Sequence, residues 1–210
     1  MGIRRWRLVL DNNVVANRSR ELEQRLERTE QELRLFQRIS RFMARDMSLQ
    51  EILSGIVSLV VEFMQCDSCL IYLVDNDRLL LCASNDTSSD AVGKVSLKLD
   101  EGLTGWVARE RRLLAISREA YNDPRFKYFS DLPEDTFEAF LSAPVIFRNR
   151  VVGVINVQHR SAHAHTGYEL EMITTVGEQV GCLLMLARLP ASELERGNHA
   201  GPVFASPSRN

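Results

Sequence analysis

A three-four spacing of apolar and small residues between Ser19 and Met43 constrains the fold of this chain more than any other feature. The pattern repeats every seven residues, which is typical of a coiled-coil helix whose seam must be covered by another helix. The sequence therefore predicts a coiled-coil helix over residues 19–47, preceded by an N-terminal segment of residues 1–18. The a and d positions of this seam are Ser19, Leu22, Leu26, Thr29, Leu33, Phe36, Ser40 and Met43.

The charged flanks of this seam favour one orientation of a helix pair. Arg18 and Arg25 occupy g positions, and Glu23 and Glu30 occupy the e positions five residues on. In a parallel, in-register homodimer each arginine would face a glutamate of the second copy. Exposed pairs contribute only about 0.2–1 kcal/mol each, so they select orientation and do not drive assembly. The alternative is a single solvated helix that lays one stripe on its own domain.

Residues 48–188 predict one α+β domain. A second helix begins at Ser48, where Ser48 and Glu51 form a capping box, and a last helix begins at a similar Thr166–Glu169 pattern. Pro144 favours an edge position or a bulge in its strand. Six short runs between these helices have the alternation and turn residues of strands, at residues 69–74, 79–83, 95–99, 113–116, 140–147 and 151–157.

Composition limits the classes of function. The chain has 210 residues, 45% of them hydrophobic, and a formal net charge of -2, so we expect one compact domain without a nucleic-acid or membrane-surface role. The apolar run at the start of the chain is too short for a signal peptide or a membrane span, which favours a cytoplasmic protein. Residues 189–210 are rich in Pro, Ser, Gly and Asn and predict a disordered tail, too short for an output domain.

Four motifs in order resemble the GAF domain family, between about Ser48 and Arg188. They are the glycine-framed helix Gly102–Glu110, the loop motif Asn122–Phe126, and the two hairpin segments Ser142–Ile146 and Arg150–Val157. Within that family, the core of this sequence most resembles the GAF domains of bacterial signalling proteins. The resemblance implies an antiparallel sheet of about six strands with the end helices on one face, as in GAF and PAS domains. It also implies a small-molecule pocket on the other face, under the short helix and the long loop of residues 117–133.

The same resemblance suggests which residues line the pocket and which pair the helices. The alternative is that the pocket residues simply fill a small core and bind nothing. No cyclic-nucleotide or bilin signature can be placed, so no cofactor is named. Pocket candidates are Tyr72, Trp106, Arg109, Tyr121, Phe126, Tyr128 and Phe129, and dimer-helix candidates are Leu22, Leu26, Leu33, Phe36, Val176, Val180 and Leu183.

Two further groups of residues could carry chemistry. Cys66 and Cys69 form a C-x-x-C at a helix-to-strand junction, where small buried residues are expected rather than a redox pair. One GAF branch reduces free methionine sulfoxide with pocket cysteines, but the residues around these cysteines do not resemble it, and we predict no enzyme. His159, His163 and His165 are close enough in sequence to bind metal, yet the sequence fixes no further ligand. We therefore expect histidines of a surface turn and no metal site.

The function that these patterns favour is a signalling module. A small molecule or partner would bind under the short helix, and the end helices would pass the change across a homodimer to a downstream signalling protein. The alternative is a dimeric interaction scaffold whose pocket is empty.

Overall fold

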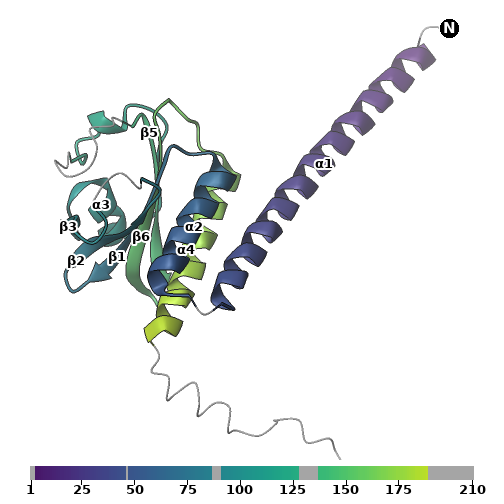
Figure 1. The fold of residues 1–210 in the computed structure, drawn as a ribbon. Coiled ribbons are helices and arrows are strands. Elements are labelled where there is room, and N and C mark those ends of the chain that lie inside the picture. The colour runs from purple at the N-terminus through teal and green to yellow at the C-terminus, as the bar shows by residue number, and fades with distance from the viewer. Residues whose placement is uncertain (1–2, 46, 87–90, 128–136, 189–210) are drawn as a thin grey trace, which may run out of the picture.

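The computed structural model describes residues 3–45, 47–86, 91–127 and 137–188. One twisted sheet separates two layers of helix, with α2 (Leu49–Met64) and α4 (Gly167–Arg188) on one face and α3 (Gly102–Glu110) on the other (Figure 1). The helix α1 (Ile3–Met43) runs beside the α2–α4 layer and away from it. The predicted tail of residues 189–210 lies outside the described residues.

All strand pairs of the sheet are antiparallel, and the strand order is β3-β2-β1-β6-β5-β4. This confirms the predicted α+β fold with about six strands and with the domain's first and last helices on one face. A short 3-10 helix, η1 (Ala120–Asn122), follows β4. The strands are β1 (Ser68–Asp75), β2 (Arg78–Ser84), β3 (Ser96–Lys98), β4 (Leu114–Ile116), β5 (Ala139–Phe147) and β6 (Arg150–His159).

Local sequence signals account for the ends of several elements. Ser48 and Glu51 form the predicted capping box of α2, with both reciprocal hydrogen bonds present. The β5–β6 hairpin turns through Arg148 and Asn149, both with positive φ, as a two-residue type I′ turn requires. Pro144 lies beyond the segment of β5 that β4 pairs with, and a bulge follows it at Val145/Ile146. The lost N–H of the proline is therefore tolerated.

The larger core lies between the sheet and the α2–α4 layer. Ile71, Leu141 and Ile155 point from the strands into it and are fully buried. On α4, Val176, Val180 and Leu183 are 0–5% exposed in this same core. This corrects the prediction that these three residues share a dimer interface, because a three-four apolar stripe looks the same whether it faces a sheet or a second chain.

Helix α1 is longer than predicted and carries two apolar faces. It begins at Ile3, so part of the predicted N-terminal segment of residues 1–18 is helical. Leu35 and Ile39 are 2% and 0% exposed and join the same buried cluster from the outer side of α2 and α4. Phe42 packs against the same core, and its ring lies directly over Gly55 of α2, where a Cβ would meet it at 2.8 Å. This face fixes the end of α1 on the domain.

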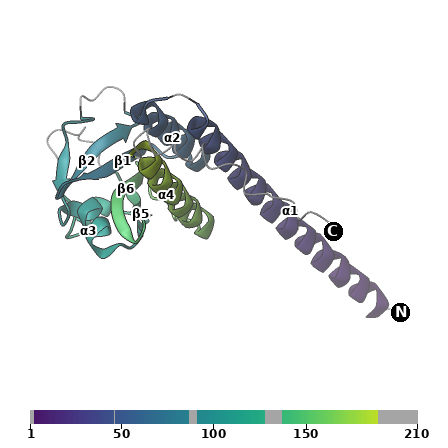
Figure 2. The same cartoon turned by 90° about the horizontal axis from the view of Figure 1, so that it is seen from below.

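The predicted heptad seam occupies a different face of α1. Leu22, Leu26 and Leu33 are 58%, 62% and 55% exposed. The N-terminal part of α1 projects past the domain in Figure 2. Phe36, nearer the domain, is half-buried. The seam leucines therefore do not cover the chain's own domain, and the helix docks through Leu35 and Ile39 instead.

One finding concerns membranes. Among the described residues, no helix is both long enough and apolar enough to span a bilayer.

Candidate ligand site

A smaller core lies between the sheet and α3. It combines apolar side chains with one buried chain of hydrogen-bonded polar side chains. Ser142 Oγ donates to Asn156 Oδ1 at 2.7 Å, and Asn156 Nδ2 donates to Thr104 Oγ1 at 2.8 Å. The three residues come from β5, β6 and α3 and are 0%, 1% and 7% exposed. Buried polar groups need such partners, since an unpaired one costs about 1–3 kcal/mol. The chain therefore fastens α3 to the centre of the sheet.

Thr104 does not cap the short helix. The helix α3 begins at Gly102 with Glu101 as its N-cap residue, and no side-chain cap hydrogen bond forms there. The Thr104 hydroxyl instead accepts the side-chain N–H of Asn156. The helix α3 also lies very close to the segment that precedes it. A Cβ on Gly105 would lie 2.7 Å from the carbonyl oxygen of Lys98, so only glycine permits this approach.

Tyr72 and Trp106, two of the pocket candidates, lie in one apolar cluster on this side of the sheet. Tyr72 is 1% exposed on β1, and burial raises the pKa of its phenol. Trp106 of α3 is partly buried and packs against the same cluster, which also contains Val107 and Val154. Both aromatics therefore belong to one apolar wall beside the Ser142–Asn156–Thr104 chain.

The loop segment of residues 117–127 lies over α3 and carries a fixed cation. The guanidinium carbon of Arg125 lies 4.4 Å from the centre of the Trp106 ring, a cation–π contact. Asp123 holds Arg125 through two side-chain hydrogen bonds of 2.7 and 2.8 Å. The hydrogen bond from Arg125 lowers the pKa of the Asp123 carboxyl, against the opposing effect of burial. This pair orients the segment against α3.

Two aromatic residues of the loop segment make separate contacts: Tyr121 forms a hydrogen bond, and Phe126 packs into an apolar cluster. The Tyr121 hydroxyl donates to Glu138 Oε1 at 3.0 Å, and Glu138 also accepts the N–H of Glu119. Phe126 packs against a small third cluster of Leu103, Ala120 and Phe140. Tyr72 and Trp106 thus belong to one apolar cluster and Phe126 to another, so these aromatics do not line one surface.

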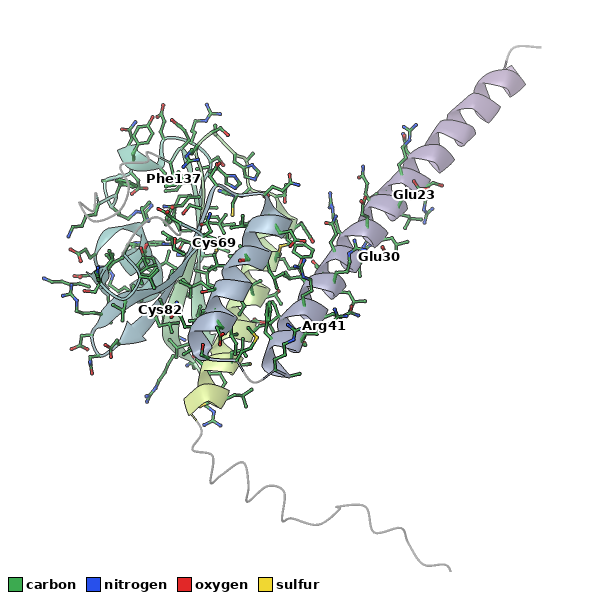
Figure 3. All side chains as sticks on the ribbon, viewed as in Figure 1. Glu23, Glu30, Arg41, Cys69, Cys82 and Phe137 are labelled. Atoms are coloured by element: carbon green, nitrogen blue, oxygen red, sulfur yellow. The ribbon has the colours of Figure 1, made fainter. Side chains whose placement is uncertain are left out.

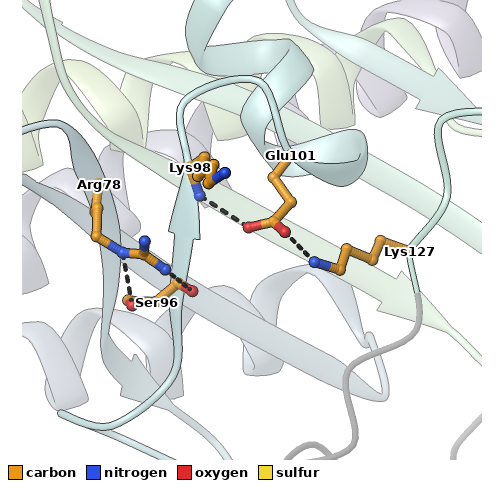
Figure 4. Close-up of polar contacts among 5 residues, drawn as sticks. All are labelled: Arg78, Ser96, Lys98, Glu101 and Lys127. Atoms are coloured by element: carbon orange, nitrogen blue, oxygen red, sulfur yellow. Dashed lines mark hydrogen bonds and ion pairs between the residues drawn. The ribbon is translucent and has the colours of Figure 1, made fainter.

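Glu101 connects three elements near α3 (Figure 4). Its carboxylate accepts the backbone N–H of Lys98 at 3.0 Å and forms an ion pair with Lys127 of the loop segment. The hydrogen bond from Lys127, followed by that from Lys98, lowers the pKa of Glu101. Figure 4 also shows Arg78 bonded to Ser96, which joins β2 to β3. The start of α3 is therefore held from both sides.

Arg109 points to a different surface from the other pocket candidates. It is exposed, pairs with Glu110 at 2.9 Å, and lines a groove of about 500 Å³ at the β1–β2 turn. Charged residues of both signs line that groove, together with one leucine. Tyr128 and Phe129 lie outside the described residues. The groove residues are Asp77, Arg78, Lys98, Leu99, Asp100 and Arg109.

The cysteines lie away from α3. Cys66 and Cys69 are buried in the core on the α2–α4 side of the sheet, as expected for small core residues, and Cys82 packs against that core from β2 (Figure 3). Burial raises the pKa of the Cys66 thiol to about 12 and that of Cys69 well above its usual value. Cys182 of α4 is exposed.

The histidines differ from the expected surface turn. His159 ends β6 and is 6% exposed, whereas His163 and His165 follow it and are partly buried. All three rings come together at the start of α4, beside Glu169.

Sequence reasoning missed Ser142 and Asn156. Both are polar residues inside otherwise apolar strands, which was a usable signal. Their pairing, however, depends on the β5–β6 register, in which Ser142 lies opposite Asn156.

The arrangement agrees with a known family. The family model described as "GAF domain" matches residues 48–184, well over half of the chain. The chain belongs to the GAF domain family. This GAF chain is 31% identical over 145 residues to a protein of Escherichia coli K12 named "Phosphoenolpyruvate-dependent phosphotransferase system", a match that covers 68% of this chain and 19% of that protein.

Regulatory proteins also contain similar GAF sequences. The Nif-specific regulatory protein of Azospirillum brasilense is 25% identical over 169 residues, covering 77% of this chain and 27% of that protein. This chain thus spans about a fifth to a quarter of the length of these relatives.

Solved GAF structures share the fold. The GAF domain of an Acinetobacter phosphoenolpyruvate-protein phosphotransferase superposes with a TM-score of 0.66 at 28% identity, covering 82% of this chain and 97% of that one. A free methionine-R-sulfoxide reductase of Neisseria meningitidis gives 0.60 at 12% identity, with coverages of 71% and 86%. The second likeness concerns the fold alone, yet it places an enzyme among the structures with this fold.

Proposed function

We propose that this chain is a cytoplasmic, non-enzymatic GAF signalling module. It binds a small molecule or partner segment beneath α3 and passes the resulting change through paired α1 helices to a downstream protein. The observation that carries this proposal is the buried Ser142–Asn156–Thr104 chain. It sets three polar groups against an apolar wall under a short helix, which is the composition of small-molecule sites.

The sheet supplies a short route from that site to α1. Asn156 alternates along β6 with Ile155 and Val157, whose side chains enter the opposite core. The same buried cluster extends through α2 and α4 to Leu35 and Ile39 of α1. A ligand that repositions β6 or α3 would therefore alter the surface on which α1 is seated. Transmission requires that the ligand bind two such states with different affinity.

The exposed seam of α1 supports a homodimer. Leu22, Leu26 and Leu33 form a stripe of large apolar side chains that no other described residue covers. Thr29, at a d position between them, donates its hydroxyl to the carbonyl of Arg25 at 3.0 Å. Its polar group is therefore satisfied within the helix, so burial against a second helix would not leave it unpaired. Glu30, which we assigned to a pair with a second chain, contacts Arg34 of its own helix at 3.6 Å.

The cysteines favour a non-enzymatic reading over sulfoxide reduction. Cys66 and Cys69 lie on the sheet face opposite α3, and their raised pKa values disfavour the thiolate that such chemistry needs.

Ligand binding and pairing are tested separately. A metabolite library screened by thermal unfolding should contain a compound that raises the melting temperature, because a ligand of the native state stabilises it. Asn156→Leu should abolish that rise. Leu26→Glu, which leaves the α3 site intact, should keep it. If no compound of the library raises the melting temperature of the wild type, the result would favour the scaffold with an empty pocket.

Pairing is measured by light scattering at several concentrations of the full chain. The wild type should have the mass of two chains at tens of micromolar. Leu22→Glu with Leu26→Glu should give one chain, because four carboxylates would face each other in the seam. Gln24→Glu adds an acid at an f position of the same helix and should leave the dimer intact. A wild-type monomer at tens of micromolar would refute the paired helices.

A further inference from the structure

Three histidines and one glutamate meet where β6 passes into α4. His159 ends the strand, His163 and His165 lie in the connection, and Glu169 lies in the first turn of the helix. One ligand atom from each residue, a ring nitrogen or a carboxylate oxygen, lies within 4.8 Å of the other three. The rings of His159 and His163 stack with their centres 4.0 Å apart, and that of His165 lies 5.0 Å from His163.

Part of this cluster has ring nitrogens without partners. His159 Nε2 and both ring nitrogens of His165 are buried and form no hydrogen bond with any described residue. The carbonyls of Ile116 and Phe140 face the His165 ring but do not meet it in normal hydrogen-bond geometry. Buried polar atoms in native proteins nearly always have partners, so three such atoms in one place indicate a group that is bound there.

The two oxygens of Glu169 have separate roles. Oε2 accepts the backbone N–H of Thr166 at 2.6 Å and its hydroxyl at 2.9 Å, completing the capping box of α4. Oε1 points to the histidines and lies 2.7 Å from His163 Nε2. The cap fixes the carboxylate in place, and its second oxygen remains available as a ligand.

We propose that His159, His163, His165 and Glu169 bind one divalent transition-metal ion, with zinc as the ion best matched to them. This site is independent of the proposed ligand site under α3. Three imidazoles and one carboxylate form a donor set that zinc accepts in tetrahedral geometry. Calcium and magnesium prefer oxygen ligands and do not match it.

The distances suit a small closure onto the ion. Ligand atoms around a tetrahedral zinc, with bonds of about 2.0–2.1 Å, lie roughly 3.3 Å apart. The widest pair, at 4.8 Å, must therefore approach by about 1.5 Å, and the Glu169–His163 pair must open slightly. Turns of the imidazole rings cover such changes without moving the backbone.

The local charges favour a cation. The Glu169 carboxylate is an anionic ligand, and its oxygen Oε1 faces the three rings. A metal binds imidazole through a ring nitrogen, and His159 and His165 both have ring nitrogens without a protein partner. When an ion binds, the carbonyls of Ile116 and Phe140 can accept the second N–H of His165, as outer partners of metal-bound histidines do.

A bound ion would connect three parts of the domain. The backbone N–H of His163 donates to the carbonyl of Ser117 at 2.9 Å, at the base of the loop segment over α3. His159 belongs to the sheet, and Glu169 belongs to α4. The ion would therefore hold the loop, the sheet and the helix at one corner.

The test uses the full chain, stripped with a chelator and then titrated with Zn²⁺ against a chromophoric competitor. One ion per chain should bind with micromolar affinity or tighter. His163→Ala and Glu169→Gln should each weaken binding at least tenfold. Glutamine serves in a capping box as glutamate does, so Glu169→Gln keeps the start of α4. Cys182→Ser removes an exposed thiol outside the cluster and should bind zinc as the wild type does.

Cobalt supplies a readout that needs no variant. Co²⁺ bound by histidines and a carboxylate should give visible bands of tetrahedral cobalt without a thiolate-to-cobalt charge-transfer band. Three results would overturn the site: no zinc uptake by the wild type below about 100 µM, equal affinity in His163→Ala and Glu169→Gln, or a charge-transfer band that assigns the ion to cysteine.

Discussion

The side-chain amide of Asn156 donates to the Thr104 hydroxyl at 2.8 Å, across 52 positions of sequence, and is completely enclosed. Thr104→Val keeps the shape of the side chain but leaves the Asn156 amide unpaired. We expect the free energy of unfolding to fall by about 1–3 kcal/mol in urea titrations. Thr174→Val is the matched control, because Thr174 is exposed and bonds only the carbonyl of Leu170 in its own helix. Equal losses in the two variants would contradict the role of the buried chain.

Ile39 and Leu26 should respond differently to truncation, although both are apolar residues of α1. Ile39→Ala opens a cavity in a core where the side chain is 0% exposed and should destabilise the domain by about 2–5 kcal/mol. Leu26→Ala, at 62% exposure, should change monomer stability by no more than about 0.5 kcal/mol. Chemical unfolding at concentrations low enough to exclude pairing measures both. A large loss in Leu26→Ala under those conditions would contradict the observed docking of α1.

Substitutions at two glycines test how closely α3 packs against the segment that precedes it. Gly105→Ala should destabilise by about 1–3 kcal/mol, since the added Cβ would meet the backbone of Lys98 at 2.7 Å and outweigh the helix propensity of alanine. Gly167→Ala, at the start of α4, meets open space and should be neutral or slightly stabilising. Differential scanning calorimetry of the two variants distinguishes these outcomes. A Gly105→Ala variant as stable as the wild type would show that α3 is not seated this closely.

The thiols should react unequally with a thiol reagent. With a pKa of about 12, only roughly one Cys66 side chain in ten thousand is a thiolate at pH 8, whereas Cys182 is exposed. A thiol reagent at pH 8 should therefore modify Cys182 quickly and Cys66 and Cys69 only after unfolding. Because the folded pKa of Cys66 exceeds that of the unfolded chain, its contribution to stability is complete below about pH 8.5 and is lost as pH rises above it. Fast modification of Cys66 in the native chain would contradict its burial.

Sequence patterns predicted those features that are local. Ser48 and Glu51, or Thr166 and Glu169, lie three residues apart, so a capping box is readable without any knowledge of the fold. The six strands were readable from alternation and turns. The heptad seam predicted a stripe of α1 whose leucines are exposed in the structure. It did not reveal Leu35 and Ile39, which form a second apolar face on the same turns.

Features that depend on distant contacts were not readable. Val176 and Val180 have the spacing of an interface and of a core alike, and only the position of the sheet distinguishes the two. Asn156 gained meaning from its register with Ser142 and from the approach of α3. Glu169 was recognisable as a cap, but the histidines at its second oxygen are brought there by the path of the chain between β6 and α4.

The two apolar faces of α1 occupy one continuous helix. The number of residues between them therefore sets the angle between the two faces. Each residue inserted between Leu26 and Leu33 would turn the domain by about 100° around the helix axis relative to Leu22 and Leu26. An insertion of seven would turn it by only about 20°. In the proposed dimer, the angle about the helix axis between the paired face and the docked face therefore determines which sides of the two domains face each other. Length changes in this helix would reorient the domains without altering any contact inside them.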